Sequence, residues 1–239
     1  LYAGIAFLAA ITLLAQLFSI PPTGWEPVQT QTDTVTAIPM PTINLSRQEM
    51  LKTRHFYVLW ITYTIGCLAG LMAIGIASPM GTEVAKLDAT MAALAVSLFA
   101  LFNGLGRPLF GAITDKLGPR HTAMLSFAMI LGVSLLVSFF GQGNAALYFF
   151  AFCVLWMCLG GWLAIAPTST GIFFGKKHYA QNYGLVFTAY GAGAILGTLI
   201  SGNIKDITGS YLGAFPIVAA LAILGIIVAA IGLRPKKAQ

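Results

Sequence analysis

Charged residues are scarce in this sequence. Of its 239 residues only 8% are Asp, Glu, Lys or Arg, whereas 58% are hydrophobic. A soluble domain usually carries about 25% charged residues, which it needs to cover its surface. The scarcity of charge therefore excludes an ordinary cytoplasmic enzyme and favours a membrane protein.

Cysteine is also scarce. The three cysteines, Cys67, Cys153 and Cys158, all lie inside apolar runs, and no C-x-x-C spacing occurs. These positions indicate neither a disulfide framework nor a metal site. We interpret the cysteines as small packing residues and expect no metal and no cofactor.

Long apolar runs dominate the sequence. A helix needs about 20 apolar residues to cross a hydrocarbon core of ~30 Å. Seven segments qualify, at roughly 1–20, 56–80, 90–113, 122–141, 145–172, 182–203 and 211–233. The chain starts within the first run, without the features of a signal peptide, so we expect it to be part of a longer protein.

Residues 21–53 differ from the rest of the chain because they are polar and contain five prolines. This composition predicts a linker. The linker ends in Ser46-Arg47-Gln48-Glu49, a capping-box pattern that predicts a short helix before the second span.

Lys and Arg residues are distributed unevenly between the loops, which predicts the orientation of the chain. One set of loops contains only Lys86 and Lys205, whereas the opposite set contains Arg47, Lys52, Arg54, Lys116, Arg120, Lys176, Lys177, Arg234, Lys236 and Lys237. We expect the second set, with the linker and the C-terminus, to be cytoplasmic. The net charge of +6 then reflects membrane topology, and no nucleic-acid partner is expected.

Two separate segments share one pattern. Residues 111–118 and residues 202–209 both read G-x-I-x-D-x-x-G, 91 residues apart. Three predicted helices lie within that period, and an odd number reverses the direction of the chain. The pattern therefore predicts an all-α protein in which 56–141 and 145–233 are inverted three-helix repeats.

The first copy of this pattern continues into a basic loop. This segment resembles the loop motif of the major facilitator superfamily, G-x-x-x-D-[RK]-x-G-x-[RK]-[RK]. The matching residues are Gly111, Asp115, Lys116, Gly118 and Arg120, and only His121 departs from the motif. The resemblance implies that residues 1–20 are the last helix of an N-terminal half. It also implies that 21–53 are the central cytoplasmic linker and 54–239 the six-helix C-terminal domain. The remainder of the N-terminal half would be a partner absent from this sequence.

Asp115 in this motif lies near the end of a helix, where its charge opposes the helix dipole. It therefore needs a cationic or helix-N-terminal partner, and Arg120 is one candidate. Such a contact would hold one transport state. The alternative is a solvated loop with a turn glycine at Gly118.

Arg107 is the one basic residue inside a span, about 12 Å of helix before Asp115. An arginine in mid-membrane costs at least ~2.5–3.5 kcal/mol on insertion scales, so it should face a cavity and hold an anion. The alternative is that its side chain extends to the cytoplasmic interface. Asn103 lies one turn earlier on the same face, and the pair suits a carboxylate.

A narrower resemblance rests on Arg107-Pro108-x-x-Gly111-x-x-x-Asp115, which is similar to the eighth helix of monocarboxylate transporters. It implies that Arg107 binds the substrate carboxylate with Asn103. Residues 49–60 and 182–191 resemble the bacterial oxalate–formate and lactate branch. Oxalate carriers have a Lys where this chain has Tyr190, so a lactate-like monoanion is expected. Tyr190 either offers a hydroxyl to it or only packs with Tyr183 and Phe187.

We expect a proton to accompany the anion, because an anion entering alone opposes a negative-inside potential. Asp206 and Lys205, with Tyr211, could form a proton-sensitive outer gate, and Glu83 and Asp88 are expected in an outer loop. Each could instead be an ordinary interfacial charge. The sequence thus predicts a plasma-membrane symporter of a small monocarboxylate such as L-lactate and not an enzyme. An oxalate/formate-type antiporter and, more remotely, a seven-helix receptor are the alternatives.

Overall fold

The computed structural model describes residues 2–17 and 44–234, and every regular element in these ranges is helical. The chain divides into two compact units, Leu1–Thr36 and Ala37–Gln239. Most of the predicted linker, and Lys236 and Lys237 of the predicted cytoplasmic C-terminus, lie outside the described residues.

The first unit contains the helix α1, Tyr2–Ala15. Its 14 residues rise about 21 Å, which is less than the ~30 Å of a hydrocarbon core. Helix formation in the range 1–20 is therefore confirmed. A complete membrane span there stays a prediction, because residues 1 and 18–20 are not among those described.

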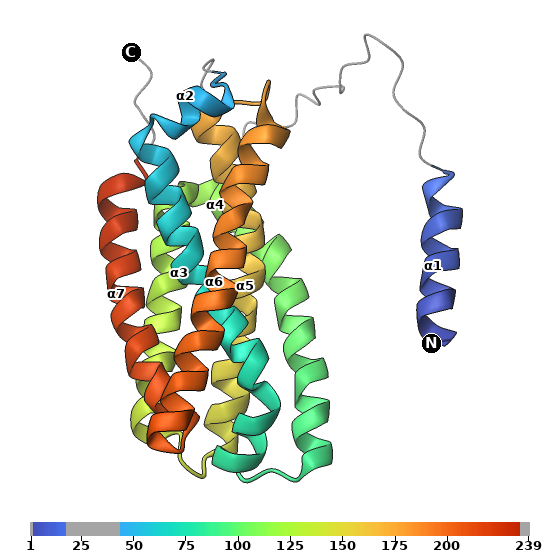
Figure 1. The fold of residues 1–239 in the computed structure, drawn as a ribbon, viewed down its shortest axis with the longest axis vertical. Helices are drawn as coiled ribbons and strands as arrows, with labels where there is room; N and C mark the ends of the chain where they lie inside the picture. Colours follow the sequence, from blue (N-terminus) through green and yellow to red (C-terminus); the bar gives the residue numbers. More distant parts are fainter. Residues whose placement is uncertain (1, 18–43, 235–239) are drawn as a thin grey trace. The chain divides into compact units, whose positions relative to one another are not determined.

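The second unit contains five helical segments that are long and apolar enough to cross a membrane. They are α3 (Arg54–Pro79) continued by η1 (Met80–Val84), α4 (Ala89–Phe140), α5 (Ala145–Phe174), α6 (Tyr179–Thr208), and η2 (Tyr211–Gly213) continued by α7 (Ala214–Gly232). The short helix α2 (Arg47–Leu51) precedes α3, and the long helices pack side by side (Figure 1). All six spans predicted within 56–233 lie in these elements.

Helix α4 is two rods joined at a sharp break. Its 52 residues include Gly118, whose φ of 78° and ψ of 164° are not helical. Pro119 begins the second rod, and the Thr122 hydroxyl donates to the Gly118 carbonyl at 2.9 Å. The rods 89–117 and 119–140 appear in green and yellow-green in Figure 1. The break falls between the predicted spans 90–113 and 122–141, and Gly118 forms the turn that was the alternative for this motif.

The helices α3 and α5 form the centre of the second unit, and both are largely buried. By contrast, most residues in the apolar stretches of α4, α6 and α7 are not buried, and the exposed large apolar side chains of these helices are mainly Leu, Ile and Phe. Such apolar surfaces suit contact with lipid. Cys67, Cys153 and Cys158 are buried in the interior, as predicted for packing residues.

Two helix pairs cross in the same way. A Cβ atom placed on Gly106 would lie 2.1 Å from the Met157 carbonyl oxygen and 3.2 Å from the Gly161 nitrogen. One placed on Gly197 would lie 2.8 Å from the Leu68 oxygen and 3.2 Å from the nitrogen of Met72. In each pair the glycine of one helix lies close to a backbone carbonyl of the other helix and to the backbone nitrogen four residues after that carbonyl. This shared arrangement agrees with the predicted inverted repeat.

One end of this unit, the α2 end, is held together by hydrogen bonds. The Asn44 side-chain oxygen accepts from the backbone N–H groups of Lys176 (3.1 Å) and Lys177 (3.0 Å). Asn182, which is buried, donates to the Leu45 carbonyl at 2.9 Å. These bonds fix the segment before α2 to the connection between α5 and α6.

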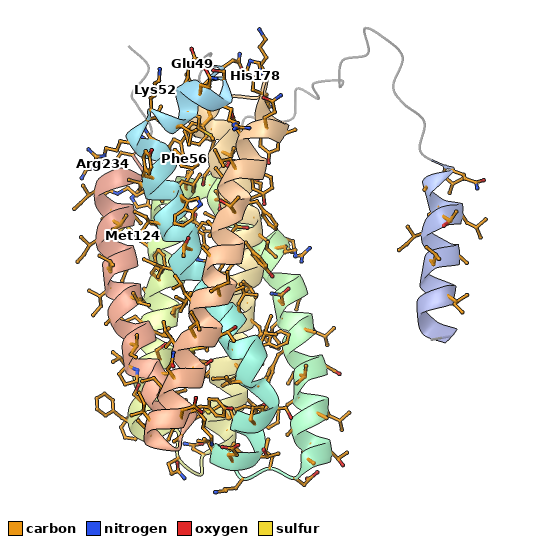
Figure 2. The ribbon with its side chains drawn as sticks, in the orientation of Figure 1. Glu49, Lys52, Phe56, Met124, His178 and Arg234 are labelled. Atoms are coloured by element: carbon orange, nitrogen blue, oxygen red, sulfur yellow. The ribbon has the colours of Figure 1, made fainter. Side chains whose placement is uncertain are left out.

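The predicted capping box is confirmed at α2. The Ser46 hydroxyl accepts from the Glu49 backbone N–H, and the Glu49 carboxylate accepts from Ser46. The hydrogen bonds from the Ser46 hydroxyl and backbone lower the pKa of the Glu49 carboxyl. Figure 2 shows Glu49 beside Lys52 and His178 at this end. The capping contribution is therefore present at neutral pH and is lost when the pH falls below the lowered pKa.

The start of α3 is also tied to the end of α7 at the α2 end. The Arg54 guanidinium donates to the Ile231 carbonyl at 3.0 Å, and His55 Nε2 donates to the Arg234 carbonyl at 3.1 Å. The opposite end of the unit, the η1 end, contains η1, η2 and the connection between the second rod of α4 and α5 (Figure 1).

Candidate functional site

Arg107 lies in the first rod of α4, eleven residues before the break at Gly118, or about 16 Å of helix. Its side chain is exposed, and no carboxylate of the described ranges pairs with it. No atom lies within 4 Å of a Cβ placed on Gly104, so the surface beside it is open. An arginine at this depth is costly without a partner, and its charge is available to an anion that reaches this surface.

Asn103 has a contact that the sequence did not reveal. Its side-chain nitrogen donates to the Trp156 carbonyl at 3.0 Å, and its own backbone oxygen lies 1.9 Å from a Cβ placed on Gly160. Asn103 therefore holds the first rod of α4 against α5. Asn103 is half-buried, whereas Arg107 is exposed. The Asn103 side chain still has one N–H and its amide oxygen for a further hydrogen bond. Contact of Asn103 with a substrate therefore stays a prediction.

Tyr190 belongs to an aromatic row on α6. Its ring stacks on Phe187, with ring centres 5.3 Å apart and planes 7° apart, and Tyr183 follows at 5.7 Å from Phe187. The structure therefore supports packing by the Tyr190 ring, and contact of its hydroxyl with a substrate stays a prediction.

Two buried aromatic residues beside this row were missed by the sequence analysis. Tyr63 of α3 lies 6.1 Å from Trp162 of α5 and 6.4 Å from Phe187, measured between ring centres. Among the described residues the Tyr63 hydroxyl and Trp162 Nε1 have no hydrogen-bond partner. Both residues lie inside continuous apolar runs, which give no sign of the helix face they occupy.

Trp60 is a third aromatic residue of this region. Its indole N–H donates to the Thr188 hydroxyl at 2.9 Å and so joins α3 to α6. Its position one turn before Tyr63 is the sequence signal that could have indicated an aromatic face on α3.

The loop motif has one confirmed role, the turn at Gly118. A Cβ on Gly111 would lie 3.9 Å from Ala164 Cβ, so this glycine lies close to α5. Asp115 and Lys116 are exposed, and no ion pair joins Asp115 to Arg120 in the described part of the chain. Arg120 Nε is instead buried without a partner there. The proposed Asp115–Arg120 contact is absent from this conformation.

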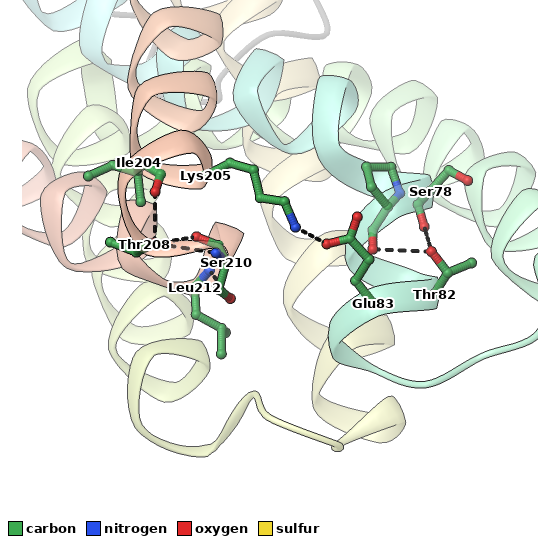
Figure 3. A network of polar contacts seen from close by, with 9 residues as sticks. Ser78, Thr82, Glu83, Ile204, Lys205, Thr208, Ser210 and Leu212 are labelled. Carbon is green, nitrogen blue, oxygen red and sulfur yellow. Dashed lines mark hydrogen bonds and ion pairs between the residues drawn. The ribbon is translucent and has the colours of Figure 1, made fainter.

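The charges at the η1 end are arranged differently from the prediction. Lys205 pairs with Glu83 and not with its neighbour Asp206, which is exposed (Figure 3). Lys205 Nζ also lies 4.9 Å from the Tyr211 ring centre. Glu83 was expected in a loop, but it lies in η1, a π-helical turn that continues α3 beyond Pro79. The pairing depends on the packing of α3 near α6, which the local sequence does not specify.

Comparison with known proteins identifies the family. Residues 59–239 match the family described as the Major Facilitator Superfamily. The oxalate:formate antiporter of Oxalobacter formigenes is 29% identical over 197 residues, which is 79% of this chain and 46% of that protein.

Two further relatives are also named as transporters. The uncharacterized MFS-type transporter YhjX of Escherichia coli (strain K12) is 28% identical over 147 residues, 62% of this chain and 36% of that protein. Monocarboxylate transporter 14 of Mus musculus is 28% identical over 134 residues, 55% of this chain and 25% of that protein. The chain spans less than half the length of each of these three relatives. The family match over most of the chain, together with the apolar helices, shows that the protein is an all-helical integral membrane protein of the Major Facilitator Superfamily.

Proposed function

We propose that the protein transports a small monocarboxylate, such as L-lactate, together with a proton by alternating access. The observation that carries this proposal is Arg107, an exposed cation within an apolar rod, with which no carboxylate of the described residues pairs. Relatives named as an oxalate:formate antiporter and a monocarboxylate transporter support a carboxylate as the substrate class. Superfamily membership sets aside the alternative of a seven-helix receptor.

The charge at this surface suits a substrate with one carboxylate. A guanidinium offers a planar pair of N–H donors that fits both carboxylate oxygens. Oxalate carriers, which this segment resembles, have a second cation where this chain has the neutral Tyr190. One arginine balances one negative charge, so we propose that a monoanion is preferred over a dianion.

Proton coupling follows from the electrical cost of moving an anion into a negative-inside compartment. This cost is about 2.3 kcal/mol per charge per 100 mV, and a co-transported proton removes it. We propose Asp206 as a proton site at the η1 end, near Lys205 and Tyr211. Because Lys205 pairs with Glu83, Asp206 enters this proposal without the cation first assigned to it.

The test of the substrate site is uptake of labelled L-lactate by the full-length protein in vesicles. Arg107→Lys keeps the charge but loses the planar pair of donors, so we expect an affinity loss of about 1.5–3 kcal/mol, or roughly tenfold to 150-fold. Arg47→Lys, the same change at an exposed position in α2, is the matched control and should leave uptake unchanged. Normal affinity in Arg107→Lys would remove Arg107 from the site.

The same vesicles distinguish the mode of transport. Symport predicts uptake that rises as external pH falls and collapses when the proton gradient is dissipated. Asp206→Asn should weaken this pH dependence while still allowing exchange of substrate for substrate. The second candidate is oxalate:formate-type exchange, which is favoured by the relative that aligns with 79% of this chain. Exchange predicts that uptake does not depend on the proton gradient and that it requires a carboxylate inside the vesicle.

A further inference from the structure

The two ends of α6 are held by different kinds of contact. At the α2 end, the buried Asn182 and the hydrogen bonds of Asn44 fix the start of the helix. The buried stripe of α6 continues as far as Ser201, which packs within the bundle. Beyond Ser201, every residue of α6 is half-buried or exposed. The last two turns of α6 therefore contain no fully buried residue, although Ile204 packs partly against the core.

An ion pair joins this end of α6 to η1. Lys205 Nζ pairs with Glu83 Oε2, and this is the one salt bridge found in the described ranges. The two helical elements α6 and η1 otherwise have little contact. Figure 3 shows Lys205 and Glu83 facing each other. Lys205 Nζ also lies 4.9 Å from the centre of the Tyr211 ring in η2.

The segment that carries Glu83 departs from regular geometry. Residues Met80–Val84 form a π-helical turn after Pro79, and Thr82 donates to the carbonyls of Ser78 (3.4 Å) and Pro79 (3.3 Å). Lys86, two residues after this turn, has a φ of 61°, which is uncommon for a residue other than glycine. Such turns concentrate at functional sites and at segments that change conformation.

The other polar groups at this end do not compete for the pair. Asp88 caps α4 by accepting from the N–H groups of Thr90 and Met91, and the Tyr148 hydroxyl donates to the Ala77 carbonyl at 2.8 Å. Lys86 and Asp206 are exposed and make no ion pair among the residues described.

We propose that Glu83 and Lys205 form a releasable latch, the η1 latch, which holds the last two turns of α6 to the end of α3 in this conformation. The side chains of Lys205 and Glu83 are 27% and 44% exposed, so they can part by exchanging each other for water. An ion pair in water contributes little to stability, whereas separating packed helices would expose apolar surface. The latch can therefore open the η1 end without unpacking the stripe that ends at Ser201.

The test measures how readily the η1 end opens and requires no substrate. Met80 lies in η1 and is almost fully buried, so Met80→Cys provides a reporter whose reaction with a maleimide reports opening. The three native cysteines are buried, and the protein without the reporter gives the background rate. Glu83→Gln and Lys205→Gln should each raise the labelling rate by about twofold to fivefold, the range expected for a partly exposed pair. Lys86→Gln removes an exposed cation from the same end and should leave the rate unchanged.

The charge-exchanged double variant Glu83→Lys/Lys205→Glu tests the pair itself, because it restores opposite charges and should return the rate towards that of the parent. Salt provides a second test on the parent, which is the protein that carries Met80→Cys and no other substitution. This test does not depend on whether a further variant folds. A high salt concentration screens exposed charges, so it should speed labelling of the parent but not of Glu83→Gln. An unchanged rate in Glu83→Gln, a double variant as fast as the single variants, or a parent insensitive to salt would overturn the latch.

Discussion

At the scale of single residues, neighbours on one helix face have different surroundings. Asn103 and Arg107 are one turn apart, yet Asn103 bonds to the α5 backbone and Arg107 is exposed. Asn103 therefore stabilises the position of the rod that carries Arg107. We propose Arg107 and the Tyr190 hydroxyl as the groups that bind an anion.

Tyr190 gives the residue-scale prediction for selectivity. Tyr190→Lys adds a second cation beside Arg107, so binding of a dianion such as oxalate should improve by about 1.5–3 kcal/mol relative to lactate. The measurement is the ratio of lactate to oxalate uptake. Tyr190→Phe is the matched control, because it keeps the stack on Phe187 and adds no charge. An unchanged ratio in Tyr190→Lys would mean that Tyr190 contributes only packing.

At the scale of elements, α4 depends on one glycine conformation. A straight helix of 52 residues would be about 78 Å long, far more than one crossing of the membrane needs. The non-helical backbone at Gly118, followed by Pro119, converts this length into two rods. The first rod can then pack on α5 while the second packs on α7.

Gly118→Ala tests this dependence. The φ and ψ angles of Gly118 lie in a region that is essentially restricted to glycine, so the substitution should destabilise the protein by about 1–3 kcal/mol. Thermal unfolding of the purified protein in detergent measures the loss. Gly132→Ala, in the second rod, is the control because a Cβ there meets no atom within 4 Å. Equal melting temperatures for the two variants would contradict a special role for Gly118.

At the scale of the whole second unit, the two crossings at Gly106 and Gly197 are counterparts. Each glycine brings its helix against the backbone of a central helix, α5 for Gly106 and α3 for Gly197. The pairing of segments about 90 residues apart is the structural counterpart of the repeated G-x-I-x-D-x-x-G pattern. Overlay of 56–141 on 145–233 after inversion is the direct check of the repeat.

The two crossings should respond alike to a small increase in side-chain size. Gly106→Ala and Gly197→Ala each place a methyl group within 3 Å of a backbone carbonyl oxygen, so each should cost about 1–3 kcal/mol of stability. Gly104→Ala and Gly202→Ala occupy open positions and should be tolerated. Detergent melting temperatures compare the four variants. A severe effect at only one crossing would argue against equivalent roles in the two repeats.

The sequence by itself determined the class of the protein, because hydrophobic length and charge scarcity are properties of the chain alone. It also located the apolar helical segments of the second unit and the Ser46–Glu49 capping box, and it offered the turn at Gly118 as the alternative to an Asp115 contact. Each of these depends on neighbouring residues. The tertiary structure decided which distant groups meet. Lys205 pairs with Glu83, 122 residues away, and Asn103 bonds to Trp156, 53 residues away. Such contacts depend on how the helices cross and on the face that each presents to its neighbour, and continuous apolar runs carry little information about that face.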